Sequence, residues 1–312
     1  MKKQTLIMKK TKNSLVFSQT NFISYLSFVF SFLVLISCTS NSEDDLGDGT
    51  EPTAPTDIIH DGNVYLKNQH ELNTFAKKGY TIINGTLVIG VLSDCDITSL
   101  KGLESLTQIN GGLNIQGTIN LNSLEGLNNI RSTQFLSIMD ADKITHIDEL
   151  KNIKSIVDDN EKDGLWVSLI VSNDNLVNID GLSNLENYKG VLEILNNKSL
   201  LNVDGLKNIN SFSARSISII RNESLKNIDG LSVVNSLSNL LDISENNSLE
   251  NLNGLNNLSS VKNTCFIRNN RNLKNLCAIE NLAGNGEDFD LYIDYNAYNP
   301  TRQDIIDGNC SQ

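Results

Sequence analysis

The sequence has 312 residues, with 25 Lys or Arg against 37 Asp or Glu, which gives a formal net charge of −12. A surface this acidic repels nucleic acid and anionic lipid headgroups, and no basic cluster stands out, so we expect no nucleic-acid partner. Aromatic residues make up only 6%, whereas Leu, Ile and Asn are abundant, a composition typical of a solenoid.

Residues 1–37 have the features of a secretory leader and are excluded from fold reasoning. They contain five lysines and no acidic residue, and their apolar run from Phe22 to Ile36 is too short for a transmembrane helix. The leader ends in Leu35-Ile36-Ser37-Cys38, which resembles the bacterial lipobox, where a signal peptidase cuts before a cysteine that carries diacylglycerol. We therefore expect Cys38 to hold a lipid anchor in a membrane. The alternative is an ordinary signal peptide in which this cysteine is incidental.

Residues 38–57 are predicted to form a disordered tether, because their Ser, Asp, Pro and Thr cannot bury enough apolar surface to fold. The cluster from Ser40 to Asp45 resembles export signals that send some Gram-negative lipoproteins to the outer face of the outer membrane. We therefore expect a lipid-anchored outer-membrane protein at the cell surface. Without the leader, 20 basic and 37 acidic residues remain, a formal charge of −17.

A repeat of about two dozen residues determines the predicted fold. It is marked by a Gly-Leu pair whose successive copies are 24, 55, 24, 25 and 24 residues apart; these begin at Gly102, Gly126, Gly181, Gly205, Gly230 and Gly254. Degenerate copies fall at Glu149-Leu150 and Ala278-Ile279. Past each strand the apolar residues step by threes, and glycine lies mid-unit, which argues against an α-helix and favours extended segments joined by tight corners.

Each repeat also contains a short strand in which apolar and outward residues alternate. The strands are Leu87–Ile89, Leu113–Ile115, Leu136–Ile138, Ser168–Ile170, Leu192–Ile194, Ile217–Ile219, Leu241–Ile243, Cys265–Ile267 and Leu291–Ile293. Strands repeated at a fixed period stack into a parallel sheet, with each coil covering its neighbour. The outward residues are mostly small or polar and form no aromatic stripe of the kind that stacks on sugars.

An asparagine follows the strand in the later repeats: Asn173, Asn197, Asn222, Asn246, Asn270 and Asn296. The corresponding positions in the N-terminal third are Leu92, Thr118 and Ala141. A buried turn leaves peptide groups that need partners, since each unpaired group costs about 1–3 kcal/mol. We predict that this column is an internal asparagine ladder with a structural role.

The repeat unit L-x-I-x-x-N-x-x-L-x-x-(I/V)-(D/N)-G-L-x-x-(L/I) resembles that of the receptor L domain, a right-handed leucine-rich β-helix, over about Gly62 to Cys310. The resemblance implies an all-β fold of about 8–9 coils. It assigns an N-terminal cap to 58–79, the solenoid to 80–296 and a C-terminal cap or tail to 297–312. Asn68 and Glu71 predict a capping-box-like start for a short helix that covers the first coil.

Four cysteines remain besides Cys38. Cys265 takes an inward strand position and is predicted to be a buried thiol. Cys277 and Cys310 bracket the last coil and tail, and we predict a disulfide between them, with Cys95 either unpaired or the alternative partner.

Two acidic features are candidate sites. Asp148, Asp180, Asp204 and Asp229, preceded by Glu125 and followed by Asn253, form a column ahead of the Gly-Leu pairs. This column could hold Ca²⁺ or a basic partner, but we expect each Asp to accept the backbone N–H of its own corner. An insertion resembles a calcium loop but has Ile170 where the final Glu should stand, so we predict a solvated excursion that contacts ligand; its candidate residues are Asp158, Asp159, Glu161, Asp163 and Trp166.

The sequence contains no recognisable catalytic motif, and the three histidines have no metal-ligand spacing, so we predict no catalytic residue, metal or cofactor. An anchor, a tether and a rigid solenoid together predict a non-catalytic recognition or adhesion module whose ligand is a protein or, less favoured, a glycan. The alternatives are a polysaccharide-cleaving β-helix enzyme, which needs a cleft where acids converge with Lys or Arg, and a passive surface-coat or assembly component.

Overall fold

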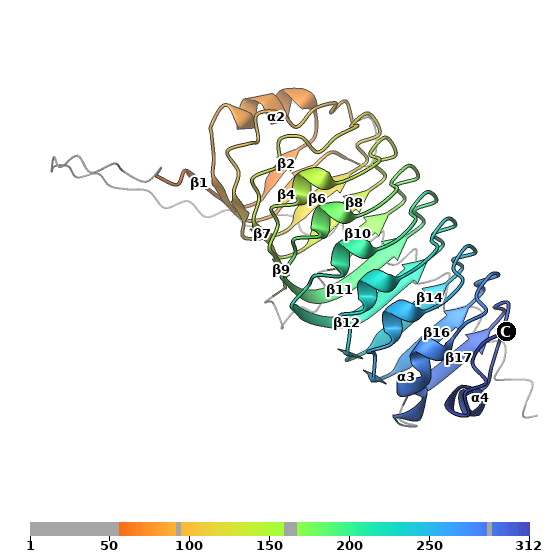
Figure 1. Cartoon of the computed structure of the whole chain (residues 1–312). Coiled ribbons are helices and arrows are strands. Elements are labelled where there is room, and N and C mark those ends of the chain that lie inside the picture. Colours follow the sequence, from red (N-terminus) through yellow and green to blue (C-terminus); the bar gives the residue numbers. More distant parts are fainter. Residues whose placement is uncertain (1–55, 92–94, 159–166, 286–288) are drawn as a thin grey trace, which may run out of the picture. The chain divides into compact units, whose positions relative to one another are not determined.

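The computed structural model of the chain describes residues 56–91, 95–158, 167–285 and 289–312. Its centre is a 15-stranded sheet in which every pairing is parallel. The main stack runs along the coils (Figure 1) and consists of β2 (Val64–Leu66), β4 (Leu87–Ile89), β6 (Leu113–Gln116), β8 (Leu136–Met139), β10 (Val167–Val171), β11 (Asn187–Leu195), β12 (Ser211–Ile220), β14 (Leu240–Ser244), β16 (Thr264–Arg268) and β17 (Asp290–Asp294). The predicted mainly β, parallel, stacked architecture is confirmed.

A second stack forms another side of the coils. It consists of β1 (Ile59–Asp61), β3 (Ile82–Asn84), β5 (Gln108–Ile109), β7 (Ser132–Thr133) and β9 (Ser155–Val157). It merges with the main stack at β11, because β11 and β12 are long enough to contribute to both sides. Two further strands, β13 (Ser236–Leu237) and β15 (Ser260–Val261), pair separately.

The Gly-Leu pairs at Gly181, Gly205, Gly230 and Gly254, and the degenerate copies at Glu149 and Ala278, lie on short 3₁₀ helices, whereas Gly102 and Gly126 lie in turns. These segments are the tight corners that the sequence predicts, and their 3₁₀ backbone is a feature that the sequence analysis did not specify. The helices are η1 (Asp148–Leu150), η2 (Asp180–Leu182), η3 (Asp204–Leu206), η4 (Asp229–Leu231), η5 (Asn253–Leu255) and η6 (Cys277–Ile279). A 3₁₀ helix has three residues per turn, which is compatible with apolar residues that step by threes. Leu200, Val203, Leu206 and Ile209 are all buried in the core.

Register across the coils keeps the apolar residues in columns inside the solenoid. Ile194, for example, lies beside Ile170 on one side and Ile219 on the other. All three are at most 2% exposed. A one-residue slip would turn each of these side chains outward, so burial of the column fixes the register.

Helix α2 (Gln69–Ala76) lies at the first coil, where Asn68 Oδ1 accepts the Glu71 N–H at 2.9 Å and Glu71 Oε2 accepts the Lys67 N–H at 2.8 Å. Leu72 is fully buried against the core. The short helices α3 (Glu280–Gly284) and α4 (Arg302–Ile306) lie at the C-terminal end. Among the described residues, no helix is both long and apolar enough to cross a bilayer.

The ladder asparagines are buried and bond each coil to the one before it. In each, Oδ1 accepts the backbone N–H at the ladder position of the preceding coil; Asn222 Oδ1, for example, accepts the Asn197 N–H at 3.1 Å. The Nδ2 of the same amide donates to a backbone carbonyl of the preceding strand; Asn222 Nδ2 donates to Ile194 O at 2.9 Å. The pattern begins where Asn173 accepts the Ala141 N–H at 3.2 Å. At the other end Asn299 accepts the Asn296 N–H at 2.8 Å, in place of a further coil.

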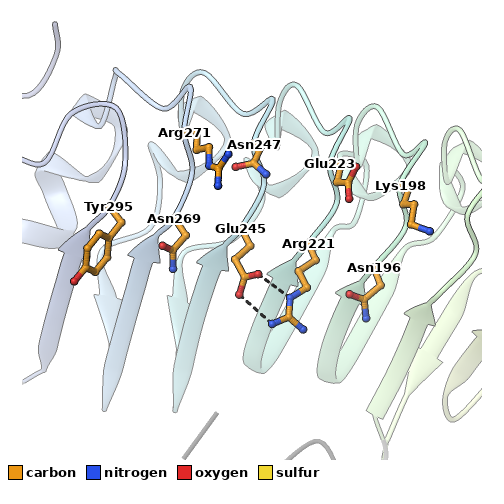
Figure 2. Close-up of a pocket in the computed structure, with 9 residues that line it drawn as sticks. All are labelled: Asn196, Lys198, Arg221, Glu223, Glu245, Asn247, Asn269, Arg271 and Tyr295. Atoms are coloured by element: carbon orange, nitrogen blue, oxygen red, sulfur yellow. Dashed lines mark hydrogen bonds and ion pairs between the residues drawn. The ribbon is translucent and has the colours of Figure 1, made fainter. Parts of the chain in front are cut away.

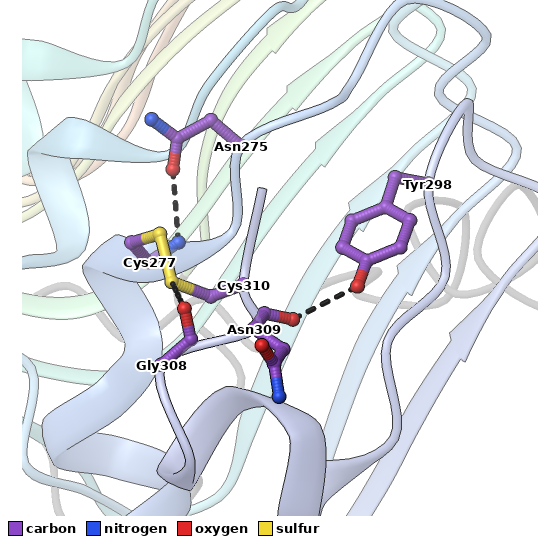
Figure 3. The surroundings of a disulfide bond; sticks show 6 residues. All are labelled: Asn275, Cys277, Tyr298, Gly308, Asn309 and Cys310. Carbon is purple, nitrogen blue, oxygen red and sulfur yellow. Dashed lines mark hydrogen bonds between the residues drawn. A yellow bond between two sulfur atoms is a disulfide. The ribbon is translucent and has the colours of Figure 1, made fainter. Parts of the chain in front are cut away.

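The C-terminal tail is fixed onto the last coil by a disulfide between Cys277 and Cys310 (Figure 3), which are separated by 33 residues. Beside it, Cys310 O accepts the Leu276 N–H at 2.9 Å, and the Tyr298 hydroxyl donates to Asn309 O at 2.9 Å. Closing a loop of this length contributes about 3–4 kcal/mol in the chain-entropy account. Cys265 and Cys95 are buried free thiols.

The ladder can be tested by substituting Asn222 with Ala. Two peptide groups of the preceding coil then lose their partner inside the core, so we expect the free energy of unfolding to fall by about 3 kcal/mol in urea denaturation. Asn208→Ala is the matched control, because Asn208 is exposed and, within the described residues, its amide donates only to Ser183 O, at 2.9 Å. That substitution should cost less than about 1 kcal/mol; equal costs would contradict a structural ladder.

Close packing of the 3₁₀ helices predicts a strong effect of Gly230→Ala. A Cβ at this position would lie 1.9 Å from the carbonyl oxygen of Val203 in the preceding coil. The two coils would have to separate, so we expect a loss of about 3 kcal/mol or more, seen as a lower midpoint in thermal unfolding by circular dichroism. Gly284→Ala is the control, because in the described part of the chain no atom beyond its own helix backbone and chain neighbours lies within 4 Å of the added Cβ. Its midpoint should stay close to that of the wild type.

Candidate functional site

An open groove runs along the turns that follow β11, β12, β14, β16 and β17 (Figure 2). Its volume is about 640 Å³, and the residues that line it are Asn196, Lys198, Arg221, Glu223, Glu245, Asn247, Asn269, Arg271 and Tyr295. They occupy the positions directly before and directly after the ladder asparagines. The ladder thus forms the inside of these turns, and the groove forms the outside.

Backbone conformation explains why the residues before the ladder point outward. Each has a positive φ, between 51° and 60°: Asp140, Ser172, Asn196, Arg221, Glu245, Asn269 and Tyr295. In the turn before Thr118, glycine takes this place at Gly117, whose φ is 61°. A residue other than glycine is uncommon in this region and is strained by about 1–2 kcal/mol.

Two of the three groove cations are held by ion pairs across neighbouring coils. Lys198 Nζ lies 2.6 Å from Asp174 Oδ2. Arg221 contacts Glu245 through two hydrogen bonds, of 2.7 and 3.2 Å, and this carboxylate raises the pKa of the guanidinium. Arg271, by contrast, forms no ion pair with any residue that the structure describes. Arg271 is therefore the groove cation whose charge is available to bind a ligand.

The outer face of the main stack changes character at its C-terminal end. The rings of Phe266 and Tyr292 stack with centroids 5.1 Å apart, and the Arg268 guanidinium lies 4.3 Å above the Phe266 ring. The outward positions of earlier strands contain residues such as Asn114, which is half-buried, and Ser137, which is buried. The outward residues are thus mostly small or polar, as predicted, and the last two strands place an aromatic pair on this face.

Asp242 is a buried carboxyl group on the same outer face, 9% exposed. Loss of hydration raises its pKa to about 6, a shift that Glu245 reinforces and that a hydrogen bond from Ser244 and the charge of Arg268 oppose. Behind it, burial also raises the pKa of the Cys265 thiol, so this cysteine is neutral and unreactive.

The acidic column ahead of the Gly-Leu pairs is not used as the sequence predicted. Asn178 Oδ1 accepts the backbone N–H of Asp180 at 3.0 Å, and Asn202 Oδ1 accepts the backbone N–H of Asp204 at 3.0 Å. The same bond recurs at Asp229, Asn253 and Cys277. An asparagine two residues earlier therefore closes each of these corners as an Asx turn, and the expectation that each Asp does so is wrong. No group of three metal-ligating side chains occurs in the described part of the chain.

Of the predicted insertion residues, only Asp158 is placed by the structure. Its backbone N–H bonds Lys189 O at 3.1 Å, which joins the end of β9 to β11. Asp159, Glu161, Asp163 and Trp166 lie outside the described residues, as does Cys38.

Sequence reasoning missed the groove. Its signal was the residue before each ladder position, where Gly117 in an early repeat is replaced by polar or aromatic residues in later repeats. A repeat position that holds glycine in one copy and other residues in later copies indicates a turn with positive φ, where the side chain of the later residues points outward.

The pKa of Asp242 predicts a pH-dependent stability. A carboxyl whose folded pKa lies above its unfolded value stabilises the fold at low pH, and this contribution is lost as pH rises through about 6. Between pH 4 and pH 7.5 the loss is about 2 kcal/mol. We therefore expect Asp242→Asn to be more stable than the wild type at pH 7.5 and nearly equal to it at pH 4, measured by urea denaturation at both pH values. An equal difference at the two pH values would refute this assignment.

Comparison with known protein families found no family model that matches the chain, and a search of curated proteins found no match either.

Proposed function

We propose that this chain is a non-catalytic recognition module displayed at the cell surface, anchored in the outer membrane by a lipid on Cys38 and spaced from it by residues 38–57. In this proposal the fold is a right-handed leucine-rich β-helix of about 8–9 coils, similar to the receptor L domain. The ligand is a protein or a glycan, and no cofactor is needed.

The observation that carries the proposal is the polar groove. The solenoid supplies a rigid backbone through its ladder and its parallel sheet, and the groove residues are held in place by turns of one repeated conformation. Rigid scaffolds that present varied side chains at repeated positions are suited to binding, because little conformational freedom is lost when the ligand docks. Five turns that share one backbone bear Asn, Arg, Glu, Asn and Tyr at the outward position.

The anchor has its own test. Cys38→Ala removes the only thiol that the proposed lipid can modify at the leader end. We expect it to abolish incorporation of a labelled fatty acid and to shift the protein from the membrane fraction to the soluble fraction. Protease treatment of intact cells should remove the wild-type protein, because the proposal places it on the cell surface. Undiminished fatty-acid labelling of Cys38→Ala would contradict the anchor.

The recognition role is tested by probing glycan and protein arrays with the full chain, with and without Ca²⁺. A ligand that binds the wild type and is lost with Arg271→Gln assigns the role to the groove. Self-association with no ligand of either kind would instead favour the passive surface-coat alternative.

The alternative function, cleavage of polysaccharides, requires a cleft that contains both carboxylates and cations. The groove contains both, so this alternative needs a test of its own. Glu245 is engaged by Arg221 and Asp174 by Lys198, which leaves Glu223 as the carboxylate of the groove without an ion pair among the described residues. Incubating polysaccharides with the full chain and measuring new reducing ends distinguishes the two roles. Cleavage that is lost in Glu223→Gln would establish the enzyme and overturn the non-catalytic proposal.

A further inference from the structure

The groove has a chemistry that favours one class of ligand. Its lining comprises three amides, five charged side chains and one tyrosine, with no aliphatic residue. Protein partners are typically held by apolar or aromatic anchors that enter desolvated pockets. Amide groups both donate and accept hydrogen bonds, as sugar hydroxyls do. The lining therefore favours a hydroxyl-rich ligand over a peptide.

Spacing adds to this preference. Adjacent parallel strands lie about 4.8 Å apart, so the groove offers one outward position per coil at nearly even intervals. A ligand that lies along the coils meets equivalent backbone at Asn196, Arg221, Glu245, Asn269 and Tyr295. Evenly repeated contacts suit a linear molecule of repeated units, such as an oligosaccharide.

Tyr295 supplies the aromatic surface at the C-terminal end of the groove. Its side chain is 76% exposed and its φ is 57°, so it combines backbone strain with an unburied ring. Figure 2 shows this ring at one end of the groove, beside Asn269. An exposed ring on a strained backbone position is suited to ligand contact, and an amphipathic ring suits the face of a sugar.

The unpaired charge of Arg271 indicates which hydroxyl-rich ligands the groove favours. Arg271 is the groove cation without an ion pair in the described part of the chain, and a guanidinium binds a carboxylate through two parallel hydrogen bonds. The chain as a whole has a net charge of −12, which repels a polyanion. One open cation in an acidic protein therefore fits a ligand that bears a single carboxylate.

We infer that the Arg271–Tyr295 end of the groove binds a short oligosaccharide that contains one uronic or sialic acid residue. The Arg271 guanidinium holds the carboxylate, Tyr295 stacks on a sugar ring, and Asn247 and Asn269 bond hydroxyl groups. This inference rests on the proposed recognition function and deepens it.

Calorimetric titration of the full chain in detergent micelles tests the inference. The probes are sialyllactose and a glucuronate-substituted xylotetraose, each beside its methyl ester and the sugar without the acidic residue. We expect both acids to bind about 10- to 100-fold more tightly than their esters, as a charge-assisted hydrogen bond requires. Arg271→Gln should abolish that difference. Lys274→Gln, which removes an exposed cation of the same coil outside the groove lining, should preserve it.

Tyr295→Gly separates binding from folding. It removes the ring and relieves the positive-φ strain, so the unfolding midpoint should be equal to or above that of the wild type, while the affinity for every probe falls about tenfold. Tyr295→Phe should retain binding.

Equal binding of acid and ester, or no binding of any probe, overturns the inference. The proposed recognition function survives those results if the arrays reveal a neutral glycan or a protein ligand that is lost with Arg271→Gln. It fails together with the inference if neither class of ligand binds.

Discussion

The structure depends on one interaction, the two-point contact between a buried asparagine amide and the preceding coil. Each turn at the end of a main-stack strand would leave a carbonyl and an N–H inside an apolar core, and an unpaired peptide group there costs about 1–3 kcal/mol. The amide of Asn222 satisfies one of each, at Ile194 and Asn197. Because both bonds point backward along the chain, each coil is completed only by the next one, and the last requires the substitute that Asn299 provides.

The same turn also positions the side chains that line the groove on the outside of the protein. A positive φ just before the ladder asparagine directs the peptide groups inward to the amide and the neighbouring side chains outward to the groove. Inside, an asparagine makes this contact in each coil from Asn173 to Asn296. Outside, the geometry imposes only the strain of the left-handed region, and the chain places Asn, Arg, Glu and Tyr there. The ladder and the groove therefore lie on two sides of one short segment, and their side chains can vary independently.

Electrostatics divide the groove into a part that is neutralised by the protein itself and a part that is open. Lys198 and Arg221 are bound by carboxylates of adjacent coils, and such exposed pairs contribute little to stability. Arg271 and Tyr295, at the C-terminal end of the groove, have no such ion pair among the described residues. The stacked Phe266 and Tyr292 and the buried Asp242 lie on the outer face of the same last strands, so this end of the solenoid differs from the rest in both charge and aromatic content.

The amino-acid sequence by itself determined the parallel stacked β architecture, the inward apolar columns and the positions of Asn173 to Asn296, because these follow from a period that is visible within each repeat. It also indicated a helix start at Asn68 and the pairing of Cys277 with Cys310. Only the tertiary structure decided the 3₁₀ form of the Gly-Leu segments, the Asx turns made by residues such as Asn178, and the groove. The contacts between coils join residues about 24 apart, as Arg221 and Glu245 are, and such residues meet only after the coils stack. The ion pair, the open Arg271 and the shape of the groove are therefore properties of neighbouring coils together, which no single repeat encodes.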